Sequence, residues 1–161
     1  MVADRLLSRT LNPRSVALFG TSPAQSVIEQ CQKLGFAGEL WPIHPTRESI
    51  AGVRCFKSVA DLPHAPDVAF IAVNRHATID VVAQLSKIGT GGAVCYASGF
   101  AESGLQSGVD GNALQQQLIK AAGEVGIRHN PDYNGAHQDG IAMSQASISG
   151  GRRMSTAACY L

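Results

Sequence analysis

Apolar residues occur along the chain in two patterns: short runs of strand length, and longer segments with helical spacing. In the longer segments they recur about every three to four positions, which predicts helices over residues 23–34, 77–88 and 112–125. The run at 67–73 is apolar throughout, as expected of a strand that is buried on both faces. The apolar runs predict strands at residues 15–20, 39–44, 67–73 and 92–97, with a fifth strand beginning at 127–129.

The alternation of strands and helices predicts the fold class. Strands that alternate with helices form parallel sheets with right-handed crossovers. We therefore expect an α/β fold, a Rossmann-like, doubly wound, mostly parallel five-stranded sheet with helices on both faces. Pro42 lies in the second predicted strand, which suits a strand that ends early or lies near an edge.

The helical and strand patterns stop at about residue 130. Residues 130–161 are rich in Gly, Ser and Asn and show little periodicity. Such a composition is typical of loops and of segments without a packed core. We expect a domain at residues 1–129, followed by an atypical segment at 130–161 that is truncated or poorly ordered.

The composition of the chain limits the kinds of molecule that it is expected to bind. The 161 residues are 45% hydrophobic, enough for one domain with a core, and the net charge of +1 predicts no broad basic face. We therefore expect no nucleic-acid partner. The longest apolar runs have strand length, so no membrane partner is expected. Dispersed cysteines without a CxxC pair indicate reduced thiols, no metal site and a cytoplasmic location; they are Cys31, Cys55, Cys95 and Cys159.

The first predicted strand–helix junction, in VALFGTSPAQSV, is a candidate anion site. Doubly wound sheets bind ligands outside the carboxyl ends of their strands, where the strand order reverses. Ser22, followed by Pro23 and by Gln25 three positions on, resembles a capping box, so the helix is expected to begin in the loop. Helix N-termini bind phosphates, and Thr21, Ser22 and Ser26 add hydroxyl groups.

The end of the second predicted strand indicates which phosphate compound is bound. A nicotinamide dinucleotide site usually has GxGxxG and an acidic residue at this strand end, and the chain has neither. The sequence His44-Pro45-Thr46-Arg47 offers cationic and hydroxyl groups instead. A ribose phosphate is therefore favoured, either the 2′-phosphate of NADP or the 3′-phosphate of coenzyme A.

Several motifs in order resemble one family. They are LNPRSVALFGTS, GFAGELWPIHP, SVADLP, PDVAFIAV, GAVCYASGFAESG and GIR. Together, over residues 6–128, they resemble the CoA-binding domain of NDP-forming acyl-CoA synthetases, a family that includes the succinyl-CoA synthetase alpha subunit. SGFAESG is the most specific of them.

The resemblance implies a site for coenzyme A built from four loops, each at the carboxyl end of a strand. The positions it implies are Gly20, Thr21, Ser22 and Ser26 at the CoA phosphates; His44, Pro45 and Arg47 at the nucleotide; Ala72, Val73 and Asn74 under the adenine or pantetheine; and Ser98, Gly99, Phe100 and Glu102 at the thiol end.

The chain departs from the family pattern at three places. Thr46 stands where a lysine is usual, and Asn74 stands where proline is common. Residues 129–135 echo a GPNxxG turn with its asparagine displaced. Simple core packing is an equal alternative for Phe100.

The resemblance also implies a function. The complete enzymes form a thioester from an acid, CoA and a nucleoside triphosphate, and they use a phosphohistidine domain and a nucleotide-grasp domain. The chain shows no paired carboxylates, GxSxG or Walker lysine loop, so we expect no catalytic residues and no activity of this chain alone. Partner ligase and nucleotide-grasp domains or subunits are implied.

Three functional hypotheses remain open. The first is a module of an acyl-CoA synthetase that binds CoA or acyl-CoA. The second is an NADP- or nucleotide-binding domain of an oxidoreductase. The third is a non-catalytic CoA-sensing protein.

Overall fold

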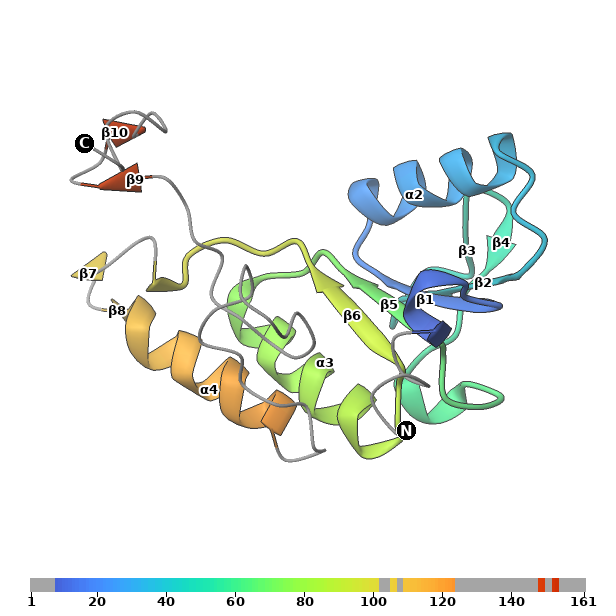
Figure 1. Cartoon of the computed structure of the whole chain (residues 1–161). Helices are drawn as coiled ribbons and strands as arrows, with labels where there is room; N and C mark the ends of the chain where they lie inside the picture. Colours follow the sequence, from blue (N-terminus) through green and yellow to red (C-terminus); the bar gives the residue numbers. More distant parts are fainter. Residues whose placement is uncertain (1–7, 102–104, 107–108, 124–147, 150–151, 154–161) are drawn as a thin grey trace.

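The fold is built on a four-stranded parallel sheet with the strand order β2-β1-β5-β6 (Figure 1). The computed structural model describes residues 8–101, 105–106, 109–123, 148–149 and 152–153. Within this part of the chain no strand lies beyond β6, and the predicted fifth strand at 127–129 lies outside it. The predicted α/β fold class is confirmed. The strands are β1 (Ser15–Phe19), β2 (Glu39–Ile43), β5 (Val68–Ile71) and β6 (Gly92–Cys95).

Helices cover both faces of the sheet, as the sequence pattern predicts. Helix α2 (Ser22–Lys33) lies on one face, and α3 (Arg75–Lys87) and α4 (Gly111–Gly123) lie together on the other (Figure 1). All three helices were predicted, and α3 begins two residues earlier than the apolar spacing indicates. The predicted segment 130–161 falls outside the described residues except for one short antiparallel pair, β9 (Ile148–Ser149) and β10 (Arg152–Arg153).

Strand β1 is central, and every one of its residues is buried. Successive side chains of a strand point to opposite faces. Val16 and Leu18 accordingly pack with Ile28 of α2, whereas Ala17 and Phe19 belong to the cluster that contains α3 and α4 residues. Each large apolar side chain buried in this way stabilises the fold by about 1.5–3 kcal/mol.

Strand β2 is an edge strand, which explains why it tolerates Pro42. The carbonyl of Pro42 accepts a hydrogen bond from the amide of Phe56 at 2.8 Å, and the amide of His44 donates to the carbonyl of Phe56 at 2.9 Å. Phe56 follows a small hairpin, so this segment covers part of the edge. The short elements not predicted from the sequence are β3 (Ser49–Ile50), β4 (Val53–Arg54), the 3-10 turn η1 (Val59–Asp61), β7 (Leu105–Gln106) and β8 (Val109–Asp110).

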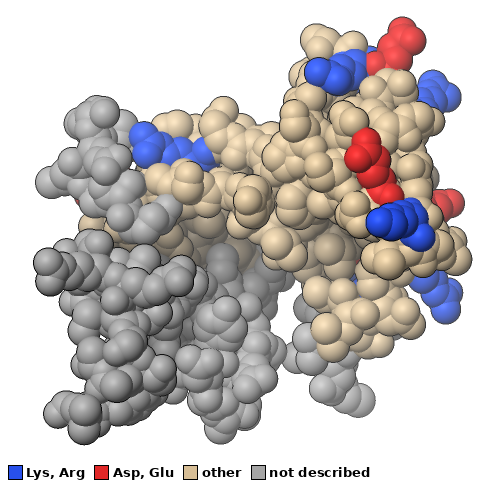
Figure 2. All heavy atoms as spheres, turned by 90° about the horizontal axis from the view of Figure 1, so that it is seen from above, with Lys and Arg blue, Asp and Glu red and all other residues tan. Residues whose placement is uncertain are grey.

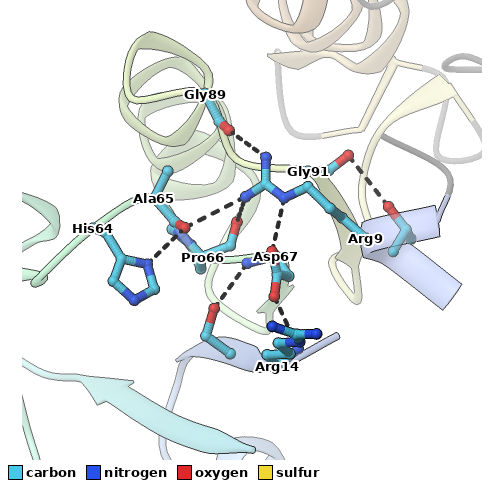
Figure 3. Close-up of polar contacts among 10 residues, drawn as sticks. Arg9, Arg14, His64, Ala65, Pro66, Asp67, Gly89 and Gly91 are labelled. Atoms are coloured by element: carbon cyan, nitrogen blue, oxygen red, sulfur yellow. Dashed lines mark hydrogen bonds and ion pairs between the residues drawn. The ribbon is translucent and has the colours of Figure 1, made fainter. Parts of the chain in front are cut away.

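A polar network closes the amino-terminal edge of the sheet (Figure 3). Arg9, in the helical stretch 8–11, donates from Nε to Oδ1 of Asp67 at 2.7 Å, and the amide of Arg14 donates to Oδ2 at 2.8 Å. A further guanidinium nitrogen of Arg9 donates to the carbonyl of Pro66 at 3.1 Å. Asp67 immediately precedes β5, so this network holds Arg9 and Arg14 at the edge opposite the predicted site.

The surface charge of the described residues is sparse. On the face seen in Figure 2, groups of Lys and Arg side chains are separated by uncharged residues, and some of them lie beside Asp or Glu. Within the described ranges, no helix is both long and apolar enough to cross a bilayer.

Candidate functional site

The carboxyl ends of the four strands bring the predicted loops to one edge of the sheet. The chain passes from β1 to β2 on one side, and β5 lies on the other side of β1, so the strand order reverses between β1 and β5. Ligands of doubly wound sheets bind at such a point. The loops at 20–22, 44–47, 72–74 and 98–100 lie at this edge, because all four strands are parallel. Glu102 lies outside the described residues.

Gly20 brings the loops after β1 and β5 into direct contact. Its φ of +120° belongs to the region that favours glycine, and a Cβ at this position would lie 2.5 Å from the carbonyl oxygen of Ala72. The amide of Ala72 donates to the carbonyl of Phe19 at 2.9 Å. Gly20 alone therefore provides both the tight turn and the close approach of the two loops, for which the GxGxxG motif uses separate glycines.

The start of α2 differs from the predicted capping box. Thr21, and not Ser22, is the N-cap, and no side chain caps the helix. The side chain of Gln25 donates to Glu29 Oε1 at 2.8 Å, and Ser26 Oγ donates to the carbonyl of Ser22 at 3.2 Å. The capping-box prediction is wrong because Thr21, with φ −110° and ψ −87°, lies outside the extended conformation that such a cap requires.

The absence of this cap leaves the helix terminus open to a ligand. The first N–H groups of a helix have no partner within it, and the first turn of α2 contains no acidic residue. Within the described residues, the hydroxyls of Thr21 and Ser22 have no hydrogen-bond partner either. The loop therefore presents N–H and O–H donors together with the positive end of the helix dipole.

The turn that ends β2 is held by His44. Its Nδ1 accepts hydrogen bonds from the amides of Thr46 at 3.3 Å and Arg47 at 3.1 Å. Pro45 is exposed in the same turn. The imidazole therefore has a structural role, while the side chain of Arg47 stays exposed.

Lys57 adds a second cation to this turn, which the sequence analysis missed. Its Nζ donates to the carbonyl of Arg47 at 2.9 Å. Burial raises the pKa of the Cys55 thiol, while the charges of Lys57 and Arg47 act in the opposite direction, so both cations lie near it. The signal in the sequence was the resemblance, in which Thr46 occupies a position that is usually lysine; the sequence did not indicate that Lys57, ten positions after Arg47, would reach this turn.

A hollow of about 910 Å³ borders this turn on the side of the β3–β4 hairpin. Its lining carries both signs of charge, with Glu48 and Asp61 as well as Arg54 and Lys57. It lies beside the strand edge and does not include the switch point. Among the described residues, no group of three or more His, Cys, Asp or Glu side chains could hold a metal ion.

The residues after β5 have mainly structural contacts. Asn74 is the N-cap of α3, and its Oδ1 accepts a hydrogen bond from the amide of Ala77 at 3.0 Å. Val73 is partly buried against the core. Phe100 is only 5% exposed and belongs to the same core cluster, as its packing interpretation predicts, while Ser98 is exposed.

Arg75 is the second residue that the sequence analysis missed. It is the first residue of α3, and its Nη1 donates to the carbonyl of Gly99 at 3.0 Å. Gly99 has φ +96°, and a Cβ there would lie 2.6 Å from Nη1 of Arg75. The sequence does show that Arg75 directly follows the loop after β5. It does not show that the side chain reaches the loop after β6.

Comparisons with known proteins show the family of the chain. A family described as a CoA binding domain matches residues 14–132. A trans-feruloyl-CoA synthase from an unknown prokaryotic organism is 32% identical over 130 residues, which cover 78% of this chain and 18% of that protein. The ADP-forming acetate–CoA ligase II of Archaeoglobus fulgidus is 31% identical over 121 residues, 72% of this chain and 17% of that protein.

A solved structure supports the same relationship. The apo form of the dinucleotide-forming acetyl-coenzyme A synthetase 1 of Ca. Korarchaeum cryptofilum matches with a TM-score of 0.65 and 31% sequence identity. The match covers 76% of this chain and 26% of that one. The chain thus spans about a sixth to a quarter of the length of these relatives.

Proposed function

Because the chain belongs to the family of CoA-binding domains, homologous to part of the NDP-forming acyl-CoA synthetases, we propose that it binds coenzyme A or acyl-CoA along the carboxyl edge of its sheet. The ligand is a substrate of the larger reaction, in which an acid is converted to its thioester. Further ligase and nucleotide-grasp domains or subunits would activate the acid. We place this function in the cytoplasm, as the dispersed cysteines predict.

The observation that carries the proposal is the loop after β1. Gly20 places it against Ala72 at the switch point, and the uncapped start of α2, with the hydroxyl residues Thr21 and Ser22, lies at the same edge. Such a terminus suits the pyrophosphate of CoA.

The order of the strands supports our placement of the rest of the ligand. At the end of β2, Arg47 and Lys57 provide charge for the 3′-phosphate. The ends of β5 and β6 lie on the other side of β1, and there we place the pantetheine arm and the thiol. In this proposal Lys57, which follows the β3–β4 hairpin, supplies the positive charge that a lysine at position 46 would otherwise supply.

Calorimetric titration with CoA, acetyl-CoA, NADP and NAD tests the proposal. We expect heat from CoA and acetyl-CoA and none from NAD. NADP is the informative competitor, because Arg47 and Lys57 could also accept its 2′-phosphate. Binding of NADP without binding of CoA would make the chain a dinucleotide domain and overturn the proposal.

A turnover assay separates binding from catalysis. With an acid, ATP and CoA present, we expect no thioester from this chain alone, because the described loops contain groups for binding and none for phosphoryl transfer. Thioester formation by the chain alone would contradict this division of roles.

A further inference from the structure

Arg75 links the two loops at the thiol end of the proposed site. It begins α3, directly after the loop of β5, and its hydrogen bond to the carbonyl of Gly99 reaches the loop of β6. Only glycine can occupy position 99 without moving the guanidinium, because a Cβ would lie 2.6 Å from Nη1 and 3.1 Å from Cδ of Arg75. The side chain of Arg75 therefore links the two loops directly.

The charge of Arg75 is not explained by the stability of its helix. A cation at a helix N-terminus opposes the dipole, whereas Lys87 in the last turn of α3 has the favourable arrangement. Arg75 is only partly exposed, and no carboxylate of the described residues pairs with it. Its Nε and Nη2 groups have no acceptor in the described part of the chain.

The strand order places this cation far from the nucleotide end. Strands β2 and β6 are the two edges of the described sheet, three strand spacings or about 14 Å apart. A ligand with its ribose phosphate at Arg47 and its pyrophosphate at Gly20 would extend its uncharged arm toward β5 and β6. The free N–H groups of Arg75 can donate to the carbonyl oxygens of that arm.

We propose that Arg75 is a positioning residue for the pantetheine arm of CoA: it fixes the Ser98–Phe100 turn through Gly99 and donates to a carbonyl oxygen of the arm or of its thioester. This role rests on the proposed function. It predicts that Arg75 contributes to the binding of CoA and acetyl-CoA and not to the binding of the nucleotide part alone.

The test compares CoA with adenosine 3′,5′-bisphosphate, which lacks the pantetheine arm. For Arg75→Met we expect about tenfold weaker CoA binding and less than about a twofold change for the bisphosphate. Arg75→Lys, which keeps the charge but loses the planar fork of donors, is expected to recover part of the affinity. Lys87→Met, at the opposite end of the same helix, is the matched control and should leave both affinities unchanged.

Equal weakening of both ligands by Arg75→Met, or no weakening of either, would overturn the role of Arg75. Melting curves of each variant show whether the fold is intact, and Arg75→Lys carries the same comparison if Arg75→Met does not fold. Failure of the unaltered chain to bind CoA would overturn the proposed function itself, which is a different outcome.

Discussion

Gly20 determines how closely the loops after β1 and β5 approach. A side chain at this position would meet two obstacles, the positive φ and the Ala72 carbonyl, and a comparison with a second glycine separates them. Gly35 also has a positive φ, +70°, but a Cβ there would meet nothing within 4 Å. We expect Gly35→Ala to lower the free energy of unfolding by about 1 kcal/mol, from backbone strain alone. Gly20→Ala, which adds the clash with the Ala72 carbonyl, should cost about 3 kcal/mol. Urea unfolding measures both, and equal losses would show that the close approach has no energetic role.

The cations at the end of β2 lead to a second prediction at the scale of single residues. Arg47→Ala and Lys57→Met should each weaken CoA about three- to tenfold, because each removes a charge placed for the 3′-phosphate. Both variants should bind dephospho-CoA, which lacks that group, with little change. Calorimetry with the two ligands measures the difference.

Arg54→Met is the control for this pair, since Arg54 is a cation of the same hairpin region and, among the described residues, donates none of the hydrogen bonds that hold the His44–Arg47 turn. If the Arg47 and Lys57 variants lose affinity equally for CoA and dephospho-CoA, these cations do not bind the 3′-phosphate.

At the scale of elements, the start of α3 explains a departure from the family pattern. Asn74 stands where proline is common, and its φ of −63° is the value to which proline is restricted. The backbone therefore suits either residue, but only Asn supplies the side-chain acceptor for the amide of Ala77. Proline at this position would make the backbone more rigid, whereas Asn74 provides a helix cap.

Replacement of Asn74 measures the contribution of this cap. Asn74→Ala should lower the free energy of unfolding by about 1 kcal/mol, because the amide of Ala77 loses its acceptor. Asn74→Asp retains an acceptor and adds a charge that favours the helix dipole, so it should restore the loss. Urea unfolding of the three proteins tests this, and an Asn74→Ala variant as stable as the original would show that the cap contributes nothing.

At the scale of the whole molecule, Asp67 joins the segment from Arg9 to Arg14 to the sheet and makes the stability of the fold depend on pH. Burial alone would raise the pKa of this carboxyl, but hydrogen bonds from Arg9 and the Arg14 amide, together with the Arg9 charge, lower it below 3.8. A lowered pKa in the folded state means that the stabilisation is present above pH 3.8 and is lost as the pH falls through the folded value.

We therefore expect Asp67→Asn to be less stable than the original protein at pH 7 by about 1 kcal/mol, a modest value because Arg9 is 32% exposed. The difference should shrink below about pH 4. Unfolding curves from pH 7 to pH 2.5 measure it. A difference that stays constant over this range would exclude the ion pair as its source. The control is Asp61→Asn, whose carboxylate accepts a hydrogen bond from the Ser58 hydroxyl.

The candidate site could be predicted in part. Parallel strands bring their carboxyl ends to one edge, so the positions of the four loops followed from the order of elements alone. The packing role of Phe100 was one of two alternatives, and only its burial separated them. The capping box failed because its residue pattern does not specify the backbone conformation at Thr21.

The sequence by itself determined the elements and the fold class, because burial on alternate sides of β1 and along one face of each helix leaves a periodic pattern in the chain. Only the tertiary structure decided which side chains meet at the site. The contacts of Lys57 with the Arg47 carbonyl and of Arg75 with the Gly99 carbonyl join residues 10 and 24 positions apart. Such contacts depend on how loops from different strands fold over one edge, and no local periodicity records that.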